Sequence, residues 1–245
     1  MGTGILEGES LTKHFGGLAA VHEVDFHVDR GEIVGLIGPN GAGKTTFFNL
    51  ISGSLRATAG SISFKGKNIT GLKPHQICKL GIARTFQSVK LFNNLSVFDN
   101  VFLGSICGTA TGKGTPDARQ KTMALLELVG LSPKRSDLAM NLPVAEQKHL
   151  ELARALATEP ELLLLDEAMA GLTPTELAVS AALIRRLRDE GMTILVVEHV
   201  MPAIMALCDR IIVLNHGMKI AEGTPKEIAA DRKVIEVYLG TDSHA

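Results

Sequence analysis

A short glycine-rich stretch near the start of the chain constrains the fold more than any other feature. It fits the pattern G-x-x-x-x-G-K-[ST], which is typical of loops that bind phosphate. Its residues are Gly38, Pro39, Asn40, Gly41, Ala42, Gly43, Lys44, Thr45 and Thr46. The glycines let the backbone curl so that several N–H groups point inward at phosphate oxygens. Lys44 would add a positive charge near the β- and γ-phosphates, and the Thr45 hydroxyl would coordinate Mg²⁺.

The residues on both sides of this loop have the pattern that it requires. Residues 32–37 are mostly apolar and predict a short strand before the loop. Apolar residues at helical spacing follow the loop, and the helix that they predict would direct its positive end at the same anion. These apolar residues are Phe47, Phe48, Leu50 and Ile51. The strand and the helix around the loop argue against a chance glycine turn. The loop therefore indicates a site for a nucleoside triphosphate, but it does not distinguish a kinase from a GTPase or a transporter motor.

Length and composition are consistent with one large domain or a core with a subdomain. The chain has 245 residues, of which 45% are hydrophobic and 21% are charged, and this is ordinary for a globular protein. The net charge of -1 provides no electrostatic argument for nucleic acid. Apolar runs stay far below the roughly 18–20 residues of a membrane helix, and the N-terminus does not resemble a secretion signal. The scattered Cys78, Cys107 and Cys208 fit a reducing cytosol and suggest neither a metal site nor a disulfide.

The first part of the chain predicts two strands, at residues 5–15 and 20–28. In the second of these, Val24 and Phe26 alternate with polar neighbours, as in a half-buried antiparallel strand. Phe15 precedes a glycine pair and therefore sits at a strand end or a turn. Its ring could stack on a nucleotide base or belong to the core, and the residues alone leave both open.

Most of the remaining chain alternates between predicted strands and helices, which indicates an α/β fold with a mostly parallel sheet covered on both faces. The predicted strands are 60–65, 82–86, 161–165, 192–197, 210–214 and 218–221, and the predicted helices are 74–80, 175–189 and 201–208, followed by a helical tail at 225–239. From residue 88 to residue 156 the strand signal almost disappears. Helices are predicted there at 96–104, 118–129 and 146–157, with an exposed Gly/Thr-rich loop at 108–115.

Polar residues that suit phosphate chemistry follow three of the predicted strands. Four leucines at 162–165 predict a strand buried on both faces, and Asp166 and Glu167 come directly after it. The carboxyl ends of parallel strands are where open α/β sheets bind ligands. There Asp166 would hold Mg²⁺, usually through water, and Glu167 would polarise the attacking water. His199 would lie close to the γ-phosphate, and the Gln87 amide oxygen could join the Mg²⁺ shell, although a lone histidine at a strand end is more often structural.

The chain resembles the ATP-binding-cassette (ABC) family over nearly its whole length. The resemblance lies in the order of five features: the phosphate loop, Gln87, the helical insertion, the leucine-rich strand that ends in Asp166 and Glu167, and His199. Residues 83–87, 90–92 and 221–225 look like the ATP-binding subunits of branched-chain amino acid importers and of their urea and amide relatives. The resemblance implies a P-loop NTPase fold with a RecA-like core, an antiparallel β subdomain and a helical subdomain in a single ABC domain. The implied parts are the core at 1–87 and 157–224, the helical subdomain at 88–156 and a helical tail at 225–245.

The resemblance also implies a function and partners. The chain would be an ATPase that binds ATP and Mg²⁺ and drives transport from the cytoplasmic face of the plasma membrane, where it would be peripheral. Phe15 would stack on adenine, the loop residues 38–46 would bind the phosphates, and Gln87 with the helix at 96–104 would receive the coupling helix of a permease. Its partners would be the permease subunits and a second ATP-binding subunit in a head-to-tail dimer, with no nucleic acid.

Two segments depart from the family pattern. The signature L-S-G-G-Q, which faces the partner's ATP in these dimers, aligns here with Leu142, Pro143, Val144, Ala145 and Glu146. Pro143 has no hydroxyl and no N–H, although proline is favourable at a first helical position. Side chains at Val144 and Ala145 keep backbone away from phosphate, and Glu146 would repel it. Ala168 and Thr173 stand where the family usually has proline and Asp or Asn.

These departures predict an asymmetric pair. The loop of this chain, facing an intact partner signature, would form a working site, and the partner's loop would face the altered segment 142–146. The alternative is a regulatory ATP-binding subunit with little hydrolysis of its own. A soluble ABC protein of translation or DNA repair usually needs two fused cassettes or a long insertion, and a P-loop kinase would not need Glu167, His199 and a signature-like helix together.

Overall fold

A six-stranded sheet forms the centre of the protein, in the order β10-β9-β3-β8-β7-β6. The computed structural model describes residues 4–107 and 116–239, so the predicted loop at 108–115 lies outside the described residues. The strands are β3 (Ile33–Ile37), β6 (Ile82–Arg84), β7 (Leu162–Asp166), β8 (Thr193–Val197), β9 (Arg210–Asn215) and β10 (Met218–Gly223). The pairings within β9-β3-β8-β7-β6 are parallel, and β10 is antiparallel to β9. The predicted mostly parallel sheet is therefore confirmed.

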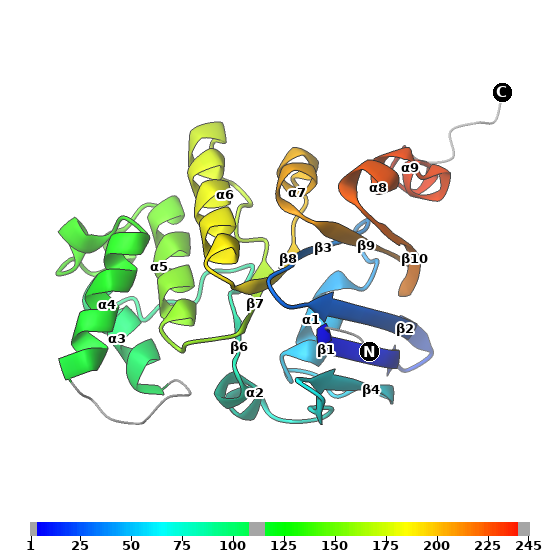
Figure 1. Ribbon diagram of the computed structural model, residues 1–245, viewed down its shortest axis with the longest axis horizontal. Coiled ribbons are helices and arrows are strands. Elements are labelled where there is room, and N and C mark those ends of the chain that lie inside the picture. The colour runs from blue at the N-terminus through cyan, green and yellow to red at the C-terminus, as the bar shows by residue number, and fades with distance from the viewer. Residues whose placement is uncertain (1–3, 108–115, 240–245) are drawn as a thin grey trace.

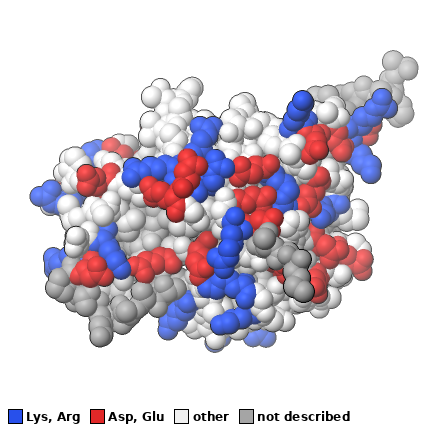
Figure 2. All heavy atoms as spheres, in the orientation of Figure 1, with Lys and Arg blue, Asp and Glu red and all other residues white. Residues whose placement is uncertain are grey.

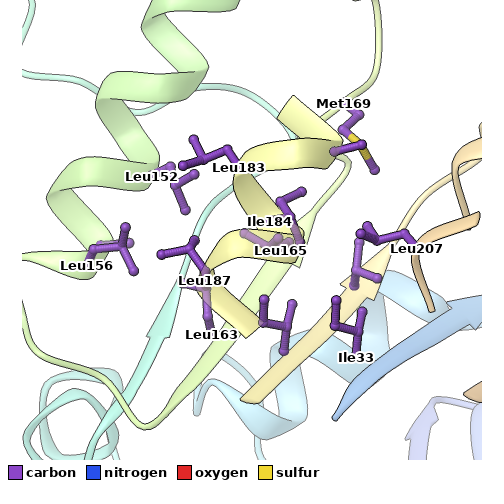
Figure 3. Close-up of a cluster of buried hydrophobic side chains, with 14 of the residues drawn as sticks. Ile33, Leu152, Leu156, Leu163, Leu165, Met169, Leu183, Ile184, Leu187 and Leu207 are labelled. Atoms are coloured by element: carbon purple, nitrogen blue, oxygen red, sulfur yellow. The ribbon is translucent and has the colours of Figure 1, made fainter. Parts of the chain in front are cut away.

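The apolar strands are buried on both faces because helices or a second sheet cover each side. Alternate residues of one strand point to opposite faces, so Leu163 and Leu165 belong to one hydrophobic cluster and Leu162 and Leu164 to the other. The first cluster packs against the helices α5 (Val144–Leu156), α6 (Pro174–Asp189) and α7 (Met201–Leu207), and Figure 3 shows Leu163 and Leu165 among side chains of these helices. The second cluster packs against α1 (Lys44–Ile51) and the second sheet.

The second sheet is antiparallel and has the order β2-β1-β4-β5. Its strands are β1 (Gly4–Phe15), β2 (Leu18–Asp29), β4 (Ala59–Phe64) and β5 (Lys67–Asn68). Val24 and Phe26 point inward as predicted, and the ring of Phe26 meets that of Phe47 of α1 edge-on at 4.6 Å. Strand β5 was not predicted, because two exposed polar residues carry no hydrophobic pattern.

The segment between β6 and β7 is helical, as predicted. It contains α3 (Val97–Cys107), α4 (Pro116–Leu128), α5 (Val144–Leu156) and the 3₁₀ turns Ser132–Lys134 and Ala139–Asn141. Figure 1 shows these helices gathered at one end of the molecule, away from the second sheet. The proposed subdomain boundaries at residues 88 and 156 stay a prediction.

The other helices are α2 (Pro74–Leu80), α6 (Pro174–Asp189), α7 (Met201–Leu207), α8 (Pro225–Ala230) and α9 (Arg232–Leu239). The helical tail predicted at 225–239 is confirmed, and it consists of two helices, α8 and α9, which are separated at Asp231. The backbone of Asp231 is extended, and its carboxylate accepts hydrogen bonds from the N–H groups of Lys233 at 2.8 Å and Val234 at 3.2 Å. A side chain that binds backbone N–H groups in this way begins a new helix.

The surface carries both signs of charge. In the view of Figure 2, basic and acidic side chains are interspersed over the helical end and the core alike. Within residues 4–107 and 116–239, every helix is too short or too polar to cross a bilayer.

Candidate nucleotide site

The glycine-rich loop connects β3 to α1, as the sequence predicts. Two of its glycines cannot be replaced without a clash. A Cβ on Gly43, whose φ is +102°, would lie 2.2 Å from the carbonyl oxygen of Ala20, and a Cβ on Gly38 would lie 2.2 Å from that of Leu214. The loop is therefore wedged between β2 and β9, and this fixes the position of the N-terminal end of α1.

Lys44 folds back over the loop. Its Nζ donates hydrogen bonds to the carbonyl oxygens of Gly38 at 2.6 Å and Pro39 at 2.9 Å. Burial lowers the pKa of Lys44, and the nearby negative charge of Glu167 acts in the opposite direction. Lys44 and Glu167, both predicted site residues, line the same cleft.

The structure joins three predicted residues in one cluster at the carboxyl edge of the sheet. Gln87 donates a hydrogen bond from Nε2 to one carboxylate oxygen of Glu167 at 2.9 Å, and His199 Nε2 lies 2.8 Å from the other. β7 and β8 are neighbouring parallel strands with Asp166 opposite Val197, so Glu167 and His199 follow at the same edge. Both oxygens of the Glu167 carboxylate are therefore held.

The loop and this cluster line a common cleft of about 520 Å³. The lining residues are Leu18, Ala19, Ala20, Asn40, Gly41, Ala42, Gly43, Lys44, Thr45, Thr46, Gln87, Glu167, His199 and His216. Phe15 lies outside this lining, at the end of β1, and the residue is 47% exposed, whereas its cross-strand partner Leu18 lines the cleft. The adenine-stacking role of Phe15 stays a prediction.

Asp166, at the end of β7, is absent from the lining of the cleft and forms a buried ion pair that the sequence did not predict. Arg84 Nη2 donates to Asp166 Oδ2 at 2.6 Å, and Arg84 Nη1 donates to Asn49 Oδ1 at 2.6 Å and to Ser52 Oγ at 2.9 Å. The side chains of Arg84 and Asp166 are 8% and 4% exposed. Arginine within a predicted buried strand is a signal for such a partner, because a buried charge needs compensation.

Two residues of α5 hold the chain segment around Gln87, and these also were not predicted. The buried Glu151 carboxylate accepts hydrogen bonds from the N–H groups of Lys90 at 3.0 Å and Phe86 at 3.4 Å. Arg154 donates to the carbonyl oxygen of Lys90. The loop that carries Gln87 is therefore attached to α5 on both sides of Gln87.

The donors around the cleft fit Mg²⁺. Thr45 and Gln87 line the cleft and offer hydroxyl and amide oxygens, and Mg²⁺ prefers oxygen ligands with one or two carboxylates, waters and substrate phosphates. The predicted carboxylate ligand, Asp166, lies outside the lining and is paired with Arg84, so its metal role stays a prediction. In the described part of the chain, His, Cys, Asp and Glu do not gather in threes that could hold a metal without such a substrate. The residues therefore suit a metal ion that enters together with a nucleotide.

The signature-like segment differs from the sequence prediction in two details. Pro143 is the N-cap of α5, with φ -56° and ψ 155°, and Val144 is the first helical residue. Val144 is 60% exposed. Glu146 is paired with Lys134, whose Nζ lies 2.6 and 2.7 Å from its two oxygens, so the predicted repulsion of phosphate by Glu146 is offset. In the second segment that departs from the family pattern, Thr173 accepts a hydrogen bond from the N–H of Glu176 and caps α6.

Comparisons with known proteins agree with this geometry. A profile described as "ABC transporter" matches residues 21–170, and one described as "Branched-chain amino acid ATP-binding cassette transporter" matches residues 218–244. The high-affinity branched-chain amino acid transport ATP-binding proteins LivG of Salmonella typhimurium and BraF of Pseudomonas aeruginosa are each 40% identical, over 96% of this chain and 98% of the relative. The lipopolysaccharide export system ATP-binding protein LptB of Escherichia coli is 35% identical over 97% of this chain and 98% of the relative.

Solved structures show the same fold. The ADP conformation of MJ1267, an ATP-binding cassette of an ABC transporter, has a TM-score of 0.89 and 31% identity over 98% of this chain and 100% of that chain. The dimeric post-hydrolysis state of the cassette MJ0796 with ADP and Pi has a TM-score of 0.81 and 25% identity over 90% of this chain and 98% of that chain.

The fold and the phosphate loop define a P-loop ATPase with a mainly parallel core sheet, an antiparallel sheet and a helical segment. The chain belongs to the ABC transporter family, as its profile match and its relatives show, and it is an ATPase of that family.

Proposed function

We propose that this chain is the ATP-hydrolysing subunit of an importer for branched-chain amino acids or related small amino acids and amides. The relatives named for branched-chain amino acid transport align over nearly their whole length, and the specialised C-terminal profile supports the same solute class. These relatives favour the hydrolysing subunit over the regulatory alternative.

The observation that carries the catalytic proposal is the Gln87–Glu167–His199 cluster at the mouth of the loop cleft. Glu167 would accept the proton of the attacking water, and His199 and Gln87 would orient its carboxylate. Thr45, Gln87 and Asp166 would hold Mg²⁺, which supplies charge neutralisation at the β- and γ-phosphates when bound. Asn40, Gly41, Ala42, Gly43 and Thr46 would contribute the loop that surrounds the phosphates.

The test is the variant Glu167→Gln, which keeps the size and hydrogen-bonding oxygen of the side chain but removes its basicity. Loss of a general base lowers the rate by about 10²- to 10⁴-fold, so phosphate release and leucine uptake into vesicles should both fall while ATP binding persists. Hydrolysis or uptake at the wild-type rate in this variant would show that Glu167 is not the base.

A groove beside Gln87 supports a permease as partner. It has a volume of about 580 Å³ and is lined by apolar residues that include Ile77, Leu91, Phe92 and Leu103. A cytoplasmic helix of the permease would seat its apolar face in this groove, and the chain would then be peripheral at the cytoplasmic face of the plasma membrane. Phe92→Asp should abolish co-purification with the permease, whereas Val179→Asp on the exposed face of α6 should not.

A second ATP-binding subunit would complete the assembly, in a head-to-tail dimer. The exposed Val144 and the N-capping Pro143 support a weak or slowly hydrolysing site where the partner's loop faces this chain. Replacing residues 143–146 by Ser, Gly, Gly and Gln should raise hydrolysis by the pair. Strong hydrolysis by this chain alone, unchanged by that replacement, would argue against the asymmetry.

A further inference from the structure

The backbone of Glu167 is held in an unusual conformation. Its φ is +52°, in the left-handed region, which costs a non-glycine residue about 1–2 kcal/mol. Its N–H donates to the carbonyl oxygen of Val197 at 2.9 Å, and its own carbonyl oxygen accepts the N–H of Ala170 at 3.2 Å. Such strain persists only where surrounding groups over-determine the conformation.

Lys148 of α5 supplies part of that determination. Its Nζ donates to the carbonyl oxygen of Glu167 at 3.0 Å and to that of Ala170 at 2.6 Å, so one ammonium group closes both ends of the turn 167–170. Hydrogen bonds from a charged donor are stronger than those between neutral groups. The ammonium therefore stabilises the turn in which the backbone of Glu167 is left-handed.

Lys148 is partly buried and has acidic neighbours. Burial lowers its pKa, and the negative charges of Glu198, Glu167 and Glu151 act in the opposite direction. The buried Glu198 accepts the N–H of Met169 at 2.5 Å, so the same turn is held by a carboxylate from the β8 side and by an ammonium from the α5 side.

The helix that carries Lys148 packs in the hydrophobic core. Figure 3 shows Leu152 and Leu156 of α5 facing Leu183 and Leu187 of α6 within the core cluster. The side chain of Lys148 thus extends from a helix that packs against α6. A displacement of the Lys148 backbone would require the core contact between α5 and α6 to change, and the two hydrogen bonds of the ammonium hold the side chain itself.

We propose that Lys148 is a positioning residue for ATP hydrolysis. It fixes the backbone of Glu167 through the carbonyl oxygen, and in this way it aims the carboxylate between Gln87 and His199 toward the nucleotide cleft. Lys148 touches no reacting atom in this role. The inference rests on the proposed role of Glu167 as the base.

The test compares Lys148→Met, Lys148→Arg and Lys121→Met in the full-length chain, assembled with its partner ATP-binding subunit, with Mg²⁺ and ATP. Misplacing a catalytic group by about 1 Å can cost about 10²-fold, so Lys148→Met should lower kcat by about 10- to 100-fold and leave KM for ATP nearly unchanged. Lys148→Arg keeps charge and donors and should recover most of the loss. Lys121 is the matched control, because it is an exposed lysine of α4 that pairs with Asp117 and Glu159.

A double-mutant cycle separates positioning from a general structural role. If Lys148 acts through Glu167, adding Lys148→Met to Glu167→Gln should lower the residual rate no further. Multiplicative losses, or a kcat of Lys148→Met equal to wild type, would overturn the proposal. Should Lys148→Met fail to fold, Lys148→Gln takes its place in the same cycle. A wild-type rate in Glu167→Gln alone would instead overturn the role of Glu167, so the two failures are distinguishable.

Discussion

The buried pair of Arg84 and Asp166 makes a strong prediction about stability. In Arg84→Met, a side chain of similar length keeps the apolar contacts but removes the guanidinium. The variant loses the 2.6 Å bond to Asp166 and the bonds to Asn49 and Ser52, which tie β6 to β7 and α1. Asp166 then remains buried, with its carboxylate uncompensated.

The expected loss follows from that uncompensated charge. Removing one partner of a buried ion pair costs about 3–5 kcal/mol, whereas an exposed pair contributes about 0–1 kcal/mol. Arg186 and Glu190 form such an exposed pair on α6, with side chains 63% and 54% exposed. Arg84→Met should therefore lower the free energy of unfolding by about 3–5 kcal/mol, and Arg186→Met by less than about 1 kcal/mol.

Urea unfolding followed by circular dichroism measures both values at neutral pH without nucleotide. The double variant Arg84→Met/Asp166→Asn should be more stable than Arg84→Met alone, because the buried charge is gone. The reasoning is refuted if Arg84→Met loses no more than Arg186→Met, or if the Asp166→Asn change brings no recovery.

Three further predictions concern the loop, a histidine and the Gln87 segment. Gly43→Ala should weaken ATP binding about tenfold or more, because its Cβ would meet the Ala20 carbonyl and strain of about 1–3 kcal/mol follows; titration with a fluorescent nucleotide measures this. Burial lowers the pKa of His149 in the folded protein. As the pH falls, the unfolded chain therefore takes up this proton at a higher pH than the folded protein does, and the free energy of unfolding should decrease below about pH 6.5. Urea unfolding at several pH values should show a smaller decrease for His149→Gln. Glu151→Gln leaves one acceptor oxygen for two N–H groups, and phosphate-release assays should show slower hydrolysis with ATP affinity retained.

The parts of the site that the sequence predicts well are those governed by local geometry. The glycine pattern requires a strand before the loop and a helix after it, and both are present as β3 and α1. Glu167 and His199 meet because each follows a neighbouring parallel strand, and that placement follows from sheet topology alone. Gln87 joins them although it lies beyond the end of β6, at Arg84.

The parts that could not be predicted join distant segments through single side chains. Lys148 reaches the turn after β7, and Glu151 reaches the backbone of Phe86 and Lys90 more than sixty positions earlier. Both lie on the polar positions of an amphipathic helix, where the usual expectation is a solvated side chain. Helical periodicity indicates which face of the helix is apolar. It does not indicate which distant backbone groups a lysine or glutamate on the polar face will bind.

The wedged glycine loop has a consequence for the speed of nucleotide capture. Ordering a flexible segment costs about 1–2 kcal/mol for each residue that is immobilised, but here Gly43 rests on Ala20, the N–H of Gly217 donates to the Ala42 carbonyl at 3.0 Å, and the ammonium of Lys44 closes the curl. An arriving triphosphate meets a receptor whose shape exists beforehand. Association should then be governed by diffusion and the release of the lysine from its own carbonyls, and slow loop rearrangement should not limit it.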